Sequence, residues 1–442
     1  MRVVRAQVRA KQLGLLSMGA IVSLAMTGCK EETKPAATAA MPGEAQKATG
    51  GNAGRPKMIM LGQPAAFTGP SAGLGIEMWR GAKTAFLEYN ARPTTSVRVD
   101  LITADDGYDA AKAPAAVTKL AEDSAVFALF GGVGTPTMVK ALPIVQSYYK
   151  KNKLFYFSNF TGAQAQREPP YSEFVFNVRA SYRDETKALV DYLSAQGRTK
   201  IGIYIQDDAY GESGKDGVVR ALTASGRELA AEARYPRGQE YSVANTAQIK
   251  TLKDARVDAI IAVGAYQACA GLIRDARKAG WNVPIANLSF VGSDQLLKIL
   301  LQEETESGTP MIVNVINSQV VPSYNAVDNL IVSQYRTAID KFKVDRPDFA
   351  DKAYQSDSPY SFGSFEGYVS ARAFIAVLEE MKGDITRENF IKTAESMGAF
   401  NIGLNTLTQF GPDRHQALDN VWLTYATKDG WQAIDPRAKI LQ

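Results

Sequence analysis

Several segments rich in glycine and hydroxyl side chains follow short apolar runs, and the chemistry of this chain is expected there. The clearest is 131–137, Gly-Gly-Val-Gly-Thr-Pro-Thr, which follows the apolar run 126–130. Thr135 and Pro136 suit an N-cap and a first helical turn. The free N–H groups and positive dipole end of such a helix start suit a carboxylate or a phosphate. The same residues are equally consistent with Thr135 simply capping its helix.

Three further segments of this kind follow apolar runs. Residues 158–162 read Ser-Asn-Phe-Thr-Gly, residues 206–212 contain three acids and Tyr210, and residues 264–266 end at Tyr266. Ligands of open parallel sheets bind where the carboxyl ends of the strands meet. These segments therefore either face a ligand cleft or only cap the helices that follow them.

The sequence gives little support for catalysis. Residues 69–73, Gly-Pro-Ser-Ala-Gly, match the nucleophile-elbow pattern, and the only histidine, His415, follows in the order of a serine hydrolase. However, so short a match arises easily by chance, Pro70 constrains the strained turn, and His415 lies in a polar run typical of a surface turn. We therefore expect no catalytic residue and keep a serine hydrolase only as a remote alternative.

Metal and cofactor chemistry have even less support. A single histidine and a single cysteine outside the leader cannot build a His- or Cys-rich transition-metal site. The glycine spacing of a dinucleotide site is missing at the first turn, and no phosphate-loop motif occurs. The sequence therefore predicts neither a metal nor a cofactor.

The elements that would position these loops alternate between short apolar strands and helical periods, which indicates βαβ units and a parallel sheet. The expected strands are 58–61, 97–103, 126–130, 154–157, 201–205, 257–263 and 312–321. The expected helices between them are 75–89, 110–122, 137–149, 184–195, 214–225, 243–252 and 267–279. A helical stretch follows at 327–343, 365–382 and 387–396, then a strand pair at 421–427 and 430–434. The pattern predicts two α/β halves.

Composition and charge favour a globular protein that does not bind nucleic acid. The chain has 442 residues, of which 45% are hydrophobic and 22% charged, and its net charge is +4. Arg2, Arg5, Arg9 and Lys11 account for that excess, because the rest of the chain has 46 basic and 46 acidic residues. A neutral body lacks the basic stripe that phosphate neutralisation requires.

The first 28 residues predict an export signal that ends at a lipidation site. Basic residues precede the apolar run 13–26, and small residues then lead to Cys29. Met26-Thr27-Gly28-Cys29 resembles the bacterial lipobox, in which the signal is cut before a cysteine that carries a diacylglyceryl group. In the alternative, the protein is secreted and Cys29 is incidental. The apolar run is shorter than the roughly 20 residues of a spanning helix, so the only membrane contact expected is the lipid.

Residues 29–56 are expected to form a disordered tether. They contain no aromatic residue and no aliphatic residue larger than Met, so they cannot bury enough apolar surface to offset the cost of ordering. Beyond this tether Cys269 is the only cysteine, and its setting suggests a buried helical position. The folded body must therefore be stable without a disulfide.

Short motifs along the body together resemble one family. They are Gly62-Gln63, Phe67-Thr68-Gly69-Pro70-Ser71-Ala72, 131–137, Phe160-Thr161-Gly162-Ala163, Phe176-Asn177-Val178-Arg179-Ala180-Ser181-Tyr182, Asp207-Asp208-Ala209-Tyr210-Gly211, 287–293, Val320-Val321-Pro322 and Phe365-Glu366-Gly367-Tyr368. In this order they resemble the type I periplasmic solute-binding proteins of the branched-chain amino acid transport family. The resemblance implies an α/β fold with two lobes, each a mostly parallel sheet flanked by helices, joined by a three-crossing hinge.

By this resemblance, the chain divides into a signal peptide, a tether and two lobes. The signal peptide is 1–28 and the tether is 29–56. The N-terminal lobe comprises 57–179 and 323–404, and the C-terminal lobe comprises 180–322 and 405–442.

The resemblance also implies a ligand site between the lobes. Thr135 matches a hydroxyl residue that, with backbone amides such as that of Gly134, holds the ligand's α-carboxylate in such proteins. Phe160, Thr161 and Gly162 match the neighbouring loop of that site. Tyr210 and Tyr266 match aromatic residues from the second lobe.

Position 289 departs from the family pattern. Relatives that bind leucine-like ligands carry a Glu there, whose charge pairs with the α-ammonium, whereas this chain has Ser289. Asp207 or Asp208 would supply the charge from another direction, although solvated acids at a helix start describe them better. Ligands without an α-amino group should therefore compete better here than in leucine-binding relatives.

The resemblance implies an exported binding lipoprotein that faces the periplasm or the cell exterior. It would act as a monomer, capture a small carboxylate-bearing ligand and deliver it to an ABC transporter permease. The alternative is a lipid-tethered receptor that reports ligand to a membrane sensor, and the sequence does not separate the two.

Overall fold

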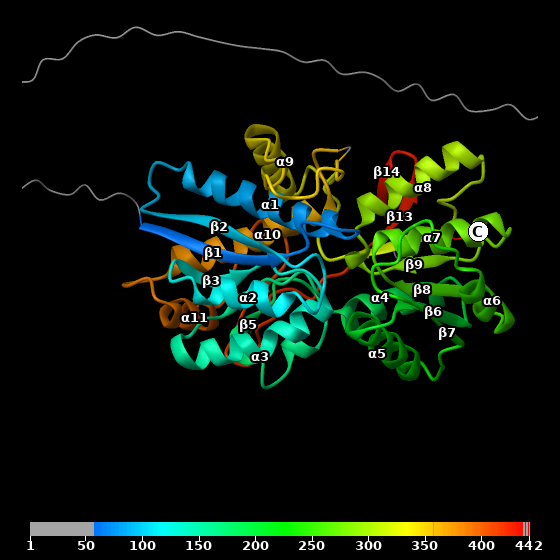
Figure 1. Ribbon diagram of the computed structural model, residues 1–442, viewed down its shortest axis with the longest axis horizontal. Helices are drawn as coiled ribbons and strands as arrows, with labels where there is room; N and C mark the ends of the chain where they lie inside the picture. Colours follow the sequence, from blue (N-terminus) through cyan, green and yellow to red (C-terminus); the bar gives the residue numbers. More distant parts are fainter. Residues whose placement is uncertain (1–56, 357, 436–437, 439–440, 442) are drawn as a thin grey trace, which may run out of the picture. The chain divides into compact units, whose positions relative to one another are not determined.

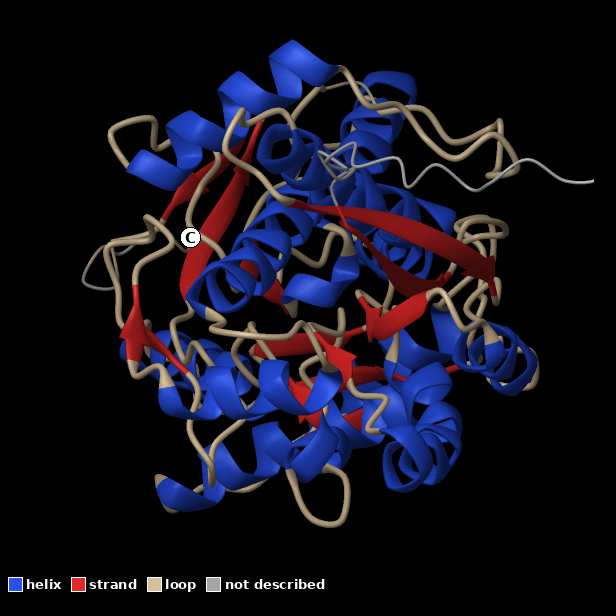
Figure 2. Cartoon of the chain, turned by 90° about the vertical axis from the view of Figure 1, so that its left-hand side faces the viewer, coloured by secondary structure: helices blue, strands red, loops and turns tan. Residues whose placement is uncertain are grey.

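A computed structural model describes residues 57–356, 358–435, 438 and 441. The signal, Cys29 and the tether lie outside these residues. The described chain forms two large sheets, each with helices on both faces, and a short two-stranded ribbon (Figure 1 and Figure 2). The predicted two-lobed α/β fold is therefore confirmed.

The first sheet has five parallel strands in the order β2-β1-β3-β4-β5. The strands are β1 (Lys57–Ala65), β2 (Val97–Asp105), β3 (Val126–Phe130), β4 (Tyr156–Phe157) and β5 (Val175–Phe176). Its helices are α1 (Ala72–Asn90), α2 (Ala113–Glu122), α3 (Thr135–Asn152), α9 (Leu330–Phe342), α10 (Phe362–Glu380) and α11 (Arg387–Ser396). Figure 1 shows α1 and α10 on one face of this sheet and α2 and α3 on the other.

The second sheet has seven strands in the order β14-β13-β10-β9-β8-β6-β7, and only β13 runs opposite to the others, so that it pairs antiparallel with both β10 and β14. The strands are β6 (Ile201–Gln206), β7 (Ala231–Tyr235), β8 (Ala259–Val263), β9 (Ile285–Asn287), β10 (Val315–Gln319), β13 (Trp422–Thr427) and β14 (Gly430–Ala433). Its helices are α4 (Tyr182–Ala195), α5 (Ala209–Ala224), α6 (Thr246–Asp254), α7 (Tyr266–Lys278) and α8 (Ser293–Ser307). The ribbon pairs β11 (Ala399–Phe400) with β12 (Thr408–Gln409).

Side-chain caps set the start of the helix that enters the second lobe. Ser181 accepts from the Asp184 backbone N–H, and the Asp184 carboxylate accepts from the Ser181 backbone N–H, which makes a capping box at α4. Asp208 caps α5 by accepting from the Tyr210 backbone N–H at 2.9 Å. Each cap satisfies a backbone donor that the helix itself leaves free.

An aromatic cluster fixes the strand ends of the first sheet. The Phe374 ring of α10 packs edge-on against Phe130 of β3 and Phe157 of β4, with centroid distances of 6.4 and 5.3 Å. All three side chains are buried. Such pairs contribute about 0.5–1.5 kcal/mol each beyond their area burial, so the loops that leave β3 and β4 start from a rigid base.

The chain passes between the two sheets three times, as predicted. It leaves the first sheet after β5, returns after β10 and crosses again before β13. The predicted lobe boundaries remain predictions. The third predicted boundary follows residue 404, yet Phe410 packs on Phe157 and Phe176 of the first sheet. We infer that this crossing lies nearer to residue 421.

The expected elements are present, but helix α8 and strands β5, β7, β9, β11 and β12 have no counterpart among them. Leu296, Leu297 and Leu300 of α8 are buried at helical spacing, so its pattern was available in the sequence. Cys269 lies in α7, fully buried and free, as expected. None of the described helices is long and apolar enough to cross a membrane.

Candidate functional site

Two loops of the first lobe lie side by side where β3 and β4 end. The backbone N–H of Phe160 donates to the Gly132 carbonyl at 2.8 Å, and the N–H of Gly134 donates to the Phe160 carbonyl at 3.2 Å. This pairing continues the sheet beyond its last residues. It brings Thr135 and Thr161 together, with their hydroxyl oxygens 2.7 Å apart in a buried setting.

Thr135 does not cap its helix, so the simpler of the two sequence interpretations is wrong. Gly134 is the N-cap, with a φ of 101° that favours glycine, and Thr135 is the first helical residue. A Cβ on Gly134 would lie 2.2 Å from the Tyr108 ring. The Thr135 hydroxyl is therefore directed to Thr161. The backbone N–H groups at the start of α3, beside Thr135, are free for an anion.

The second lobe meets these loops with an aromatic side chain that the sequence interpretation did not select. The Phe290 ring lies 5.5 Å from the ring of Phe160, 5.7 Å from Tyr108 and 4.7 Å from Tyr210. Phe160 and Tyr108 belong to the first lobe, whereas Tyr210 starts α5 in the second. Phe290 therefore packs against both lobes at the predicted site.

Two tyrosines complete the buried wall. Tyr182, at the start of α4, lies 5.2 Å from Tyr210 between ring centroids, and its backbone N–H donates to the Gly162 carbonyl. A Cβ on Gly162 would clash with Tyr182 at 2.6 Å, so this close approach requires glycine. The Tyr210 side chain is 0% exposed, and its hydroxyl has no hydrogen-bond partner among the described residues. Burial raises the pKa of Tyr210, so the hydroxyl stays protonated and able to donate.

Ser289 lies in a buried ionic cluster. The Glu185 carboxylate of α4 accepts from the Ser289 backbone N–H at 2.8 Å and from its hydroxyl at 3.0 Å. Arg179, on the first crossing, donates to Glu185 at 2.8 Å and also to the Ser289 hydroxyl. A carboxylate therefore lies beside position 289, supplied by Glu185 and paired with an arginine.

A second carboxylate reaches the same arginine from the first lobe. Glu366 of α10 accepts from Arg179 at 3.2 Å, so one guanidinium joins carboxylates of both lobes. Burial, together with the charge of Glu185, raises the pKa of Glu366 to about 7, although Arg179 opposes the rise. Burial works against the charge of Arg179, but Glu366 and Glu185 outweigh it and raise the pKa of Arg179. The cluster is therefore close to neutral when Glu366 is protonated.

Other hydrogen bonds also join the lobes around this cluster. Gln206 donates to the Tyr108 hydroxyl at 3.0 Å, and the Phe362 backbone N–H donates to Asp294 at 2.8 Å. A cavity between Ser289 and Glu366 has a volume of only about 10 Å³. This is room for about one water molecule, so the lobes are closed together at this point.

Three further predicted residues, Tyr266, Asp207 and Asp208, have different surroundings from those described above. The Tyr266 hydroxyl accepts from the Gly73 backbone, and the residue lines a separate cavity of about 660 Å³. Asp207 is exposed and paired with Arg234 at 2.8 Å, while Asp208 caps α5. The two acids therefore have the helix-start role that the sequence favoured.

The residues of the hydrolase alternative show no catalytic arrangement. Ser71 precedes α1 with a φ of −110°, which is not a strained turn. His415 is 7% exposed, stacks on Phe176 at 3.9 Å and pairs with Glu395 at 3.1 Å. The expectation of a surface position for His415 was wrong, because its ring turns inward from an exposed turn to cover Phe176.

Comparisons with known proteins support the same assignment. A family model described as periplasmic binding protein matches residues 59–431. The chain belongs to this family. The crystal structure of a possible leucine/isoleucine/valine-binding protein from Rhodopirellula baltica is 33% identical, with a TM-score of 0.77, over 88% of this chain and 98% of that one. The predicted family is thus confirmed, and it is a family of binding proteins rather than enzymes.

Two more distant structures share the fold of this periplasmic binding protein. A fatty acid ABC transporter substrate-binding protein from Thermomonospora curvata is 22% identical with a TM-score of 0.70, over 87% of this chain and 95% of that one. A branched-chain amino acid ABC transporter protein from Thermus thermophilus, with bound valine, is 14% identical with a TM-score of 0.70, over 86% and 95%. A comparison with curated protein sequences found no significant match.

Sequence reasoning missed the charged members of the site. Arg179 and Glu366 stand within motifs that carried the family resemblance, but no role was assigned to them. The available signal was a charge among apolar neighbours, since Glu366 lies between Phe365 and Gly367 in a helix whose first turns are almost wholly buried. Glu185 gave no such signal, because it follows Arg183 and Asp184 in a charged helix start.

Proposed function

We propose that this protein is an exported solute-binding lipoprotein that closes its two lobes on a small carboxylate-bearing ligand and delivers it to an ABC transporter permease. The ligand would lie between the loops at Thr135 and Thr161 and the second-lobe residues Tyr210 and Ser289. Membership of the periplasmic binding proteins supports this proposal. The lipid would be attached at Cys29.

One observation carries the proposal most directly. The buried hydroxyls of Thr135 and Thr161 pair with each other, Tyr182 of the second lobe donates its backbone N–H to Gly162 of the same loop, and Tyr210, packed on Tyr182, has a hydroxyl with no partner among the described residues. Leaving such a group unpaired costs about 1–3 kcal/mol, which a ligand carboxylate would recover. The N–H groups at the start of α3 would add further donors to the same anion.

The charges of Arg179, Glu185 and Glu366 affect which group the ligand can carry at the end away from its carboxylate. Glu185 is already paired with Arg179, and Glu366 has a pKa of about 7. Neither supplies a free carboxylate to an ammonium group below neutral pH. We therefore retain the expectation that acids without an α-amino group bind at least as well as the corresponding amino acids.

A thermal-shift comparison tests the proposal. Leucine, isoleucine and valine are compared with their deaminated acids, using the full-length chain and the variants Thr135→Ala and Tyr210→Ala. A bound ligand at about 100 times its dissociation constant stabilises by roughly 2.7 kcal/mol, which raises the melting temperature. We expect both variants to reduce this shift.

Two outcomes would change the proposal. No shift with any carboxylate, amide or amino acid would refute a small carboxylate ligand. A shift with leucine but with no deaminated acid would mean that an ammonium partner is present. Glu366→Gln then identifies that partner, because the neutral amide would abolish the leucine shift only if Glu366 binds the ammonium.

A further inference from the structure

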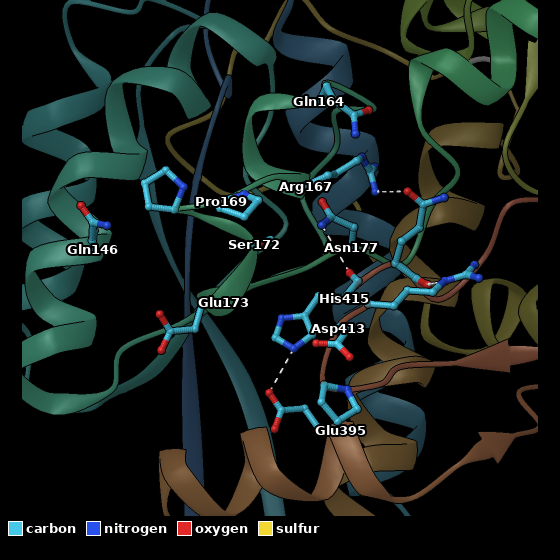
Figure 3. Close-up of a pocket in the computed structure, with 14 residues that line it drawn as sticks. Gln146, Gln164, Arg167, Pro169, Ser172, Glu173, Asn177, Glu395, Asp413 and His415 are labelled. Atoms are coloured by element: carbon cyan, nitrogen blue, oxygen red, sulfur yellow. Dashed lines mark hydrogen bonds and ion pairs between the residues drawn. The ribbon is translucent and has the colours of Figure 1, made fainter.

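Another cavity lies beside the segments that lead into the crossings. It has a volume of about 720 Å³ and is lined by residues of 164–173, by Asn177, by Glu395 of α11 and by residues 412–416 (Figure 3). It shares no lining residue with the cavity between Ser289 and Glu366. Its size falls within the range of small-molecule sites, roughly 300–1,000 Å³.

One side of this cavity carries a guanidinium, that of Arg167, that forms no ion pair with any described residue. Arg167 donates to the Gln416 side chain at 2.7 Å and to the backbone carbonyls of Thr161 and Arg179 at 3.4 and 3.3 Å. These acceptors are all neutral, and the buried Nε of Arg167 donates to no described residue. Burial and the charge of Arg179 lower the pKa of Arg167 to about 9, although the more distant charges of Asp184 and Glu185 oppose the fall. An anionic group in the cavity would offset the free-energy cost of burying the charge of Arg167.

The other side of the cavity carries carboxylates that pair with no lysine or arginine of the described chain. Glu395 contacts His415, but burial lowers the pKa of His415, so the imidazole is neutral at pH 7 and leaves the Glu395 charge unbalanced. Asp413 is exposed at the rim, and neither it nor Glu173 belongs to an ion pair within the described chain. Figure 3 shows Glu173, Glu395 and Asp413 on the sides away from Arg167.

A buried amide between the two sides supplies a further acceptor. Asn177 is 1% exposed, and its Nδ2 donates to the carbonyls of Val175 and His415, both at 3.3 Å. Its Oδ1 has no partner among the described residues. Figure 3 places Asn177 between Arg167 and His415 at the wall of the cavity. An N–H donor of a ligand would satisfy this oxygen.

We propose that this cavity binds a small zwitterion, whose carboxylate contacts Arg167 and whose protonated amine contacts Asp413, Glu395 and the Asn177 amide oxygen. A simple cation would leave Arg167 without an anion. A simple anion would face three carboxylates. Only a molecule with both charges balances both sides.

Calorimetric titration of the full-length chain tests the proposal. The probes are β-alanine, γ-aminobutyrate and ε-aminocaproate, which differ in charge separation, with butyrate and butylamine as singly charged controls. We expect one ω-amino acid of the series to bind, and Asp413→Asn and Glu395→Gln each to weaken it about tenfold, since each removes a charge-assisted contact. Asp254→Asn, an exposed acid on α6 paired only with Lys250, should have no effect.

The controls separate this cavity from the site between the lobes. Thr135→Ala should leave the ω-amino acid affinity unchanged, and Arg167→Gln should weaken it if the variant folds. The exposed Asp413 variant keeps the test decisive if Arg167→Gln does not fold. The proposal is overturned if no probe binds at about 10 mM, if butylamine or butyrate binds equally well, or if Thr135→Ala rather than Asp413→Asn removes binding. None of these outcomes would affect the leucine comparison.

Discussion

Replacing Glu366 with glutamine should change how the stability of the protein depends on pH. Glu366 is buried in the first lobe, and its pKa is raised from 4.5 to about 7. Between these two pH values the folded protein keeps the proton that the unfolded chain releases. The folded state therefore binds more protons in this window, and the free energy of unfolding falls as the pH rises from about 4.5 to 7.

The size of this effect follows from the change in pKa. A rise from 4.5 to about 7 corresponds to a loss of at most about 3 kcal/mol, complete above pH 7. Glu366→Gln keeps an oxygen that can accept from Arg179 but has no proton to lose. The variant should therefore lack this component of the pH dependence, and its stability relative to the wild type should increase as the pH rises.

Urea unfolding followed by tryptophan fluorescence between pH 4.5 and 8 measures the difference directly. Buried Asp106 and Asp294 also have raised pKa values, about 7 and 6, but they titrate equally in both proteins and cancel in the comparison. Glu380→Gln, an exposed residue at the end of the same helix, is the matched control. A difference between wild type and Glu366→Gln that stays constant within about 0.5 kcal/mol across this range would refute the reasoning.

Three further outcomes are expected. Gly134→Ala should destabilise the protein by more than Gly383→Ala, because both have a positive φ but only a Cβ at Gly134 meets the Tyr108 ring; equal changes in melting temperature would contradict this. Small-angle scattering should show a smaller radius of gyration with ligand than without it, and an unchanged radius with ligand demonstrably bound would count against lobe closure. Cys29→Ala should abolish palmitate labelling and partition into detergent, and the lipoprotein proposal fails if both persist.

The fold could be predicted from sequence because its strands and helices carry local signals. The apolar run of β3 followed by two glycines predicts a buried strand and a loop, and both are present. The role of Thr135 could not be predicted, because whether it caps α3 depends on the φ of Gly134. The requirement for glycine at this position also comes from the Tyr108 ring, which leaves no room for a Cβ and belongs to the segment between β2 and α2.

The charged part of the site could not be predicted for a different reason. Arg179 meets Ser289 and Glu366 at sequence separations of 110 and 187 residues. No local pattern relates residues so far apart, and only the folded chain brings the three together. The acidic motif at Asp207 and Asp208 was easier to notice, yet both side chains are engaged in local contacts.

The position of Arg179 has a consequence for the rate at which the lobes separate. Its guanidinium lies on a crossing and joins Glu185 of one lobe to Glu366 of the other. Opening the lobes must detach at least one of these carboxylates, and the freed charge is stable only once water reaches it. If the lobes open as proposed, hydration of this ion cluster would be part of the barrier to opening. The time that a bound solute stays enclosed would then depend on how fast water enters at the hinge, as well as on contacts with the solute itself.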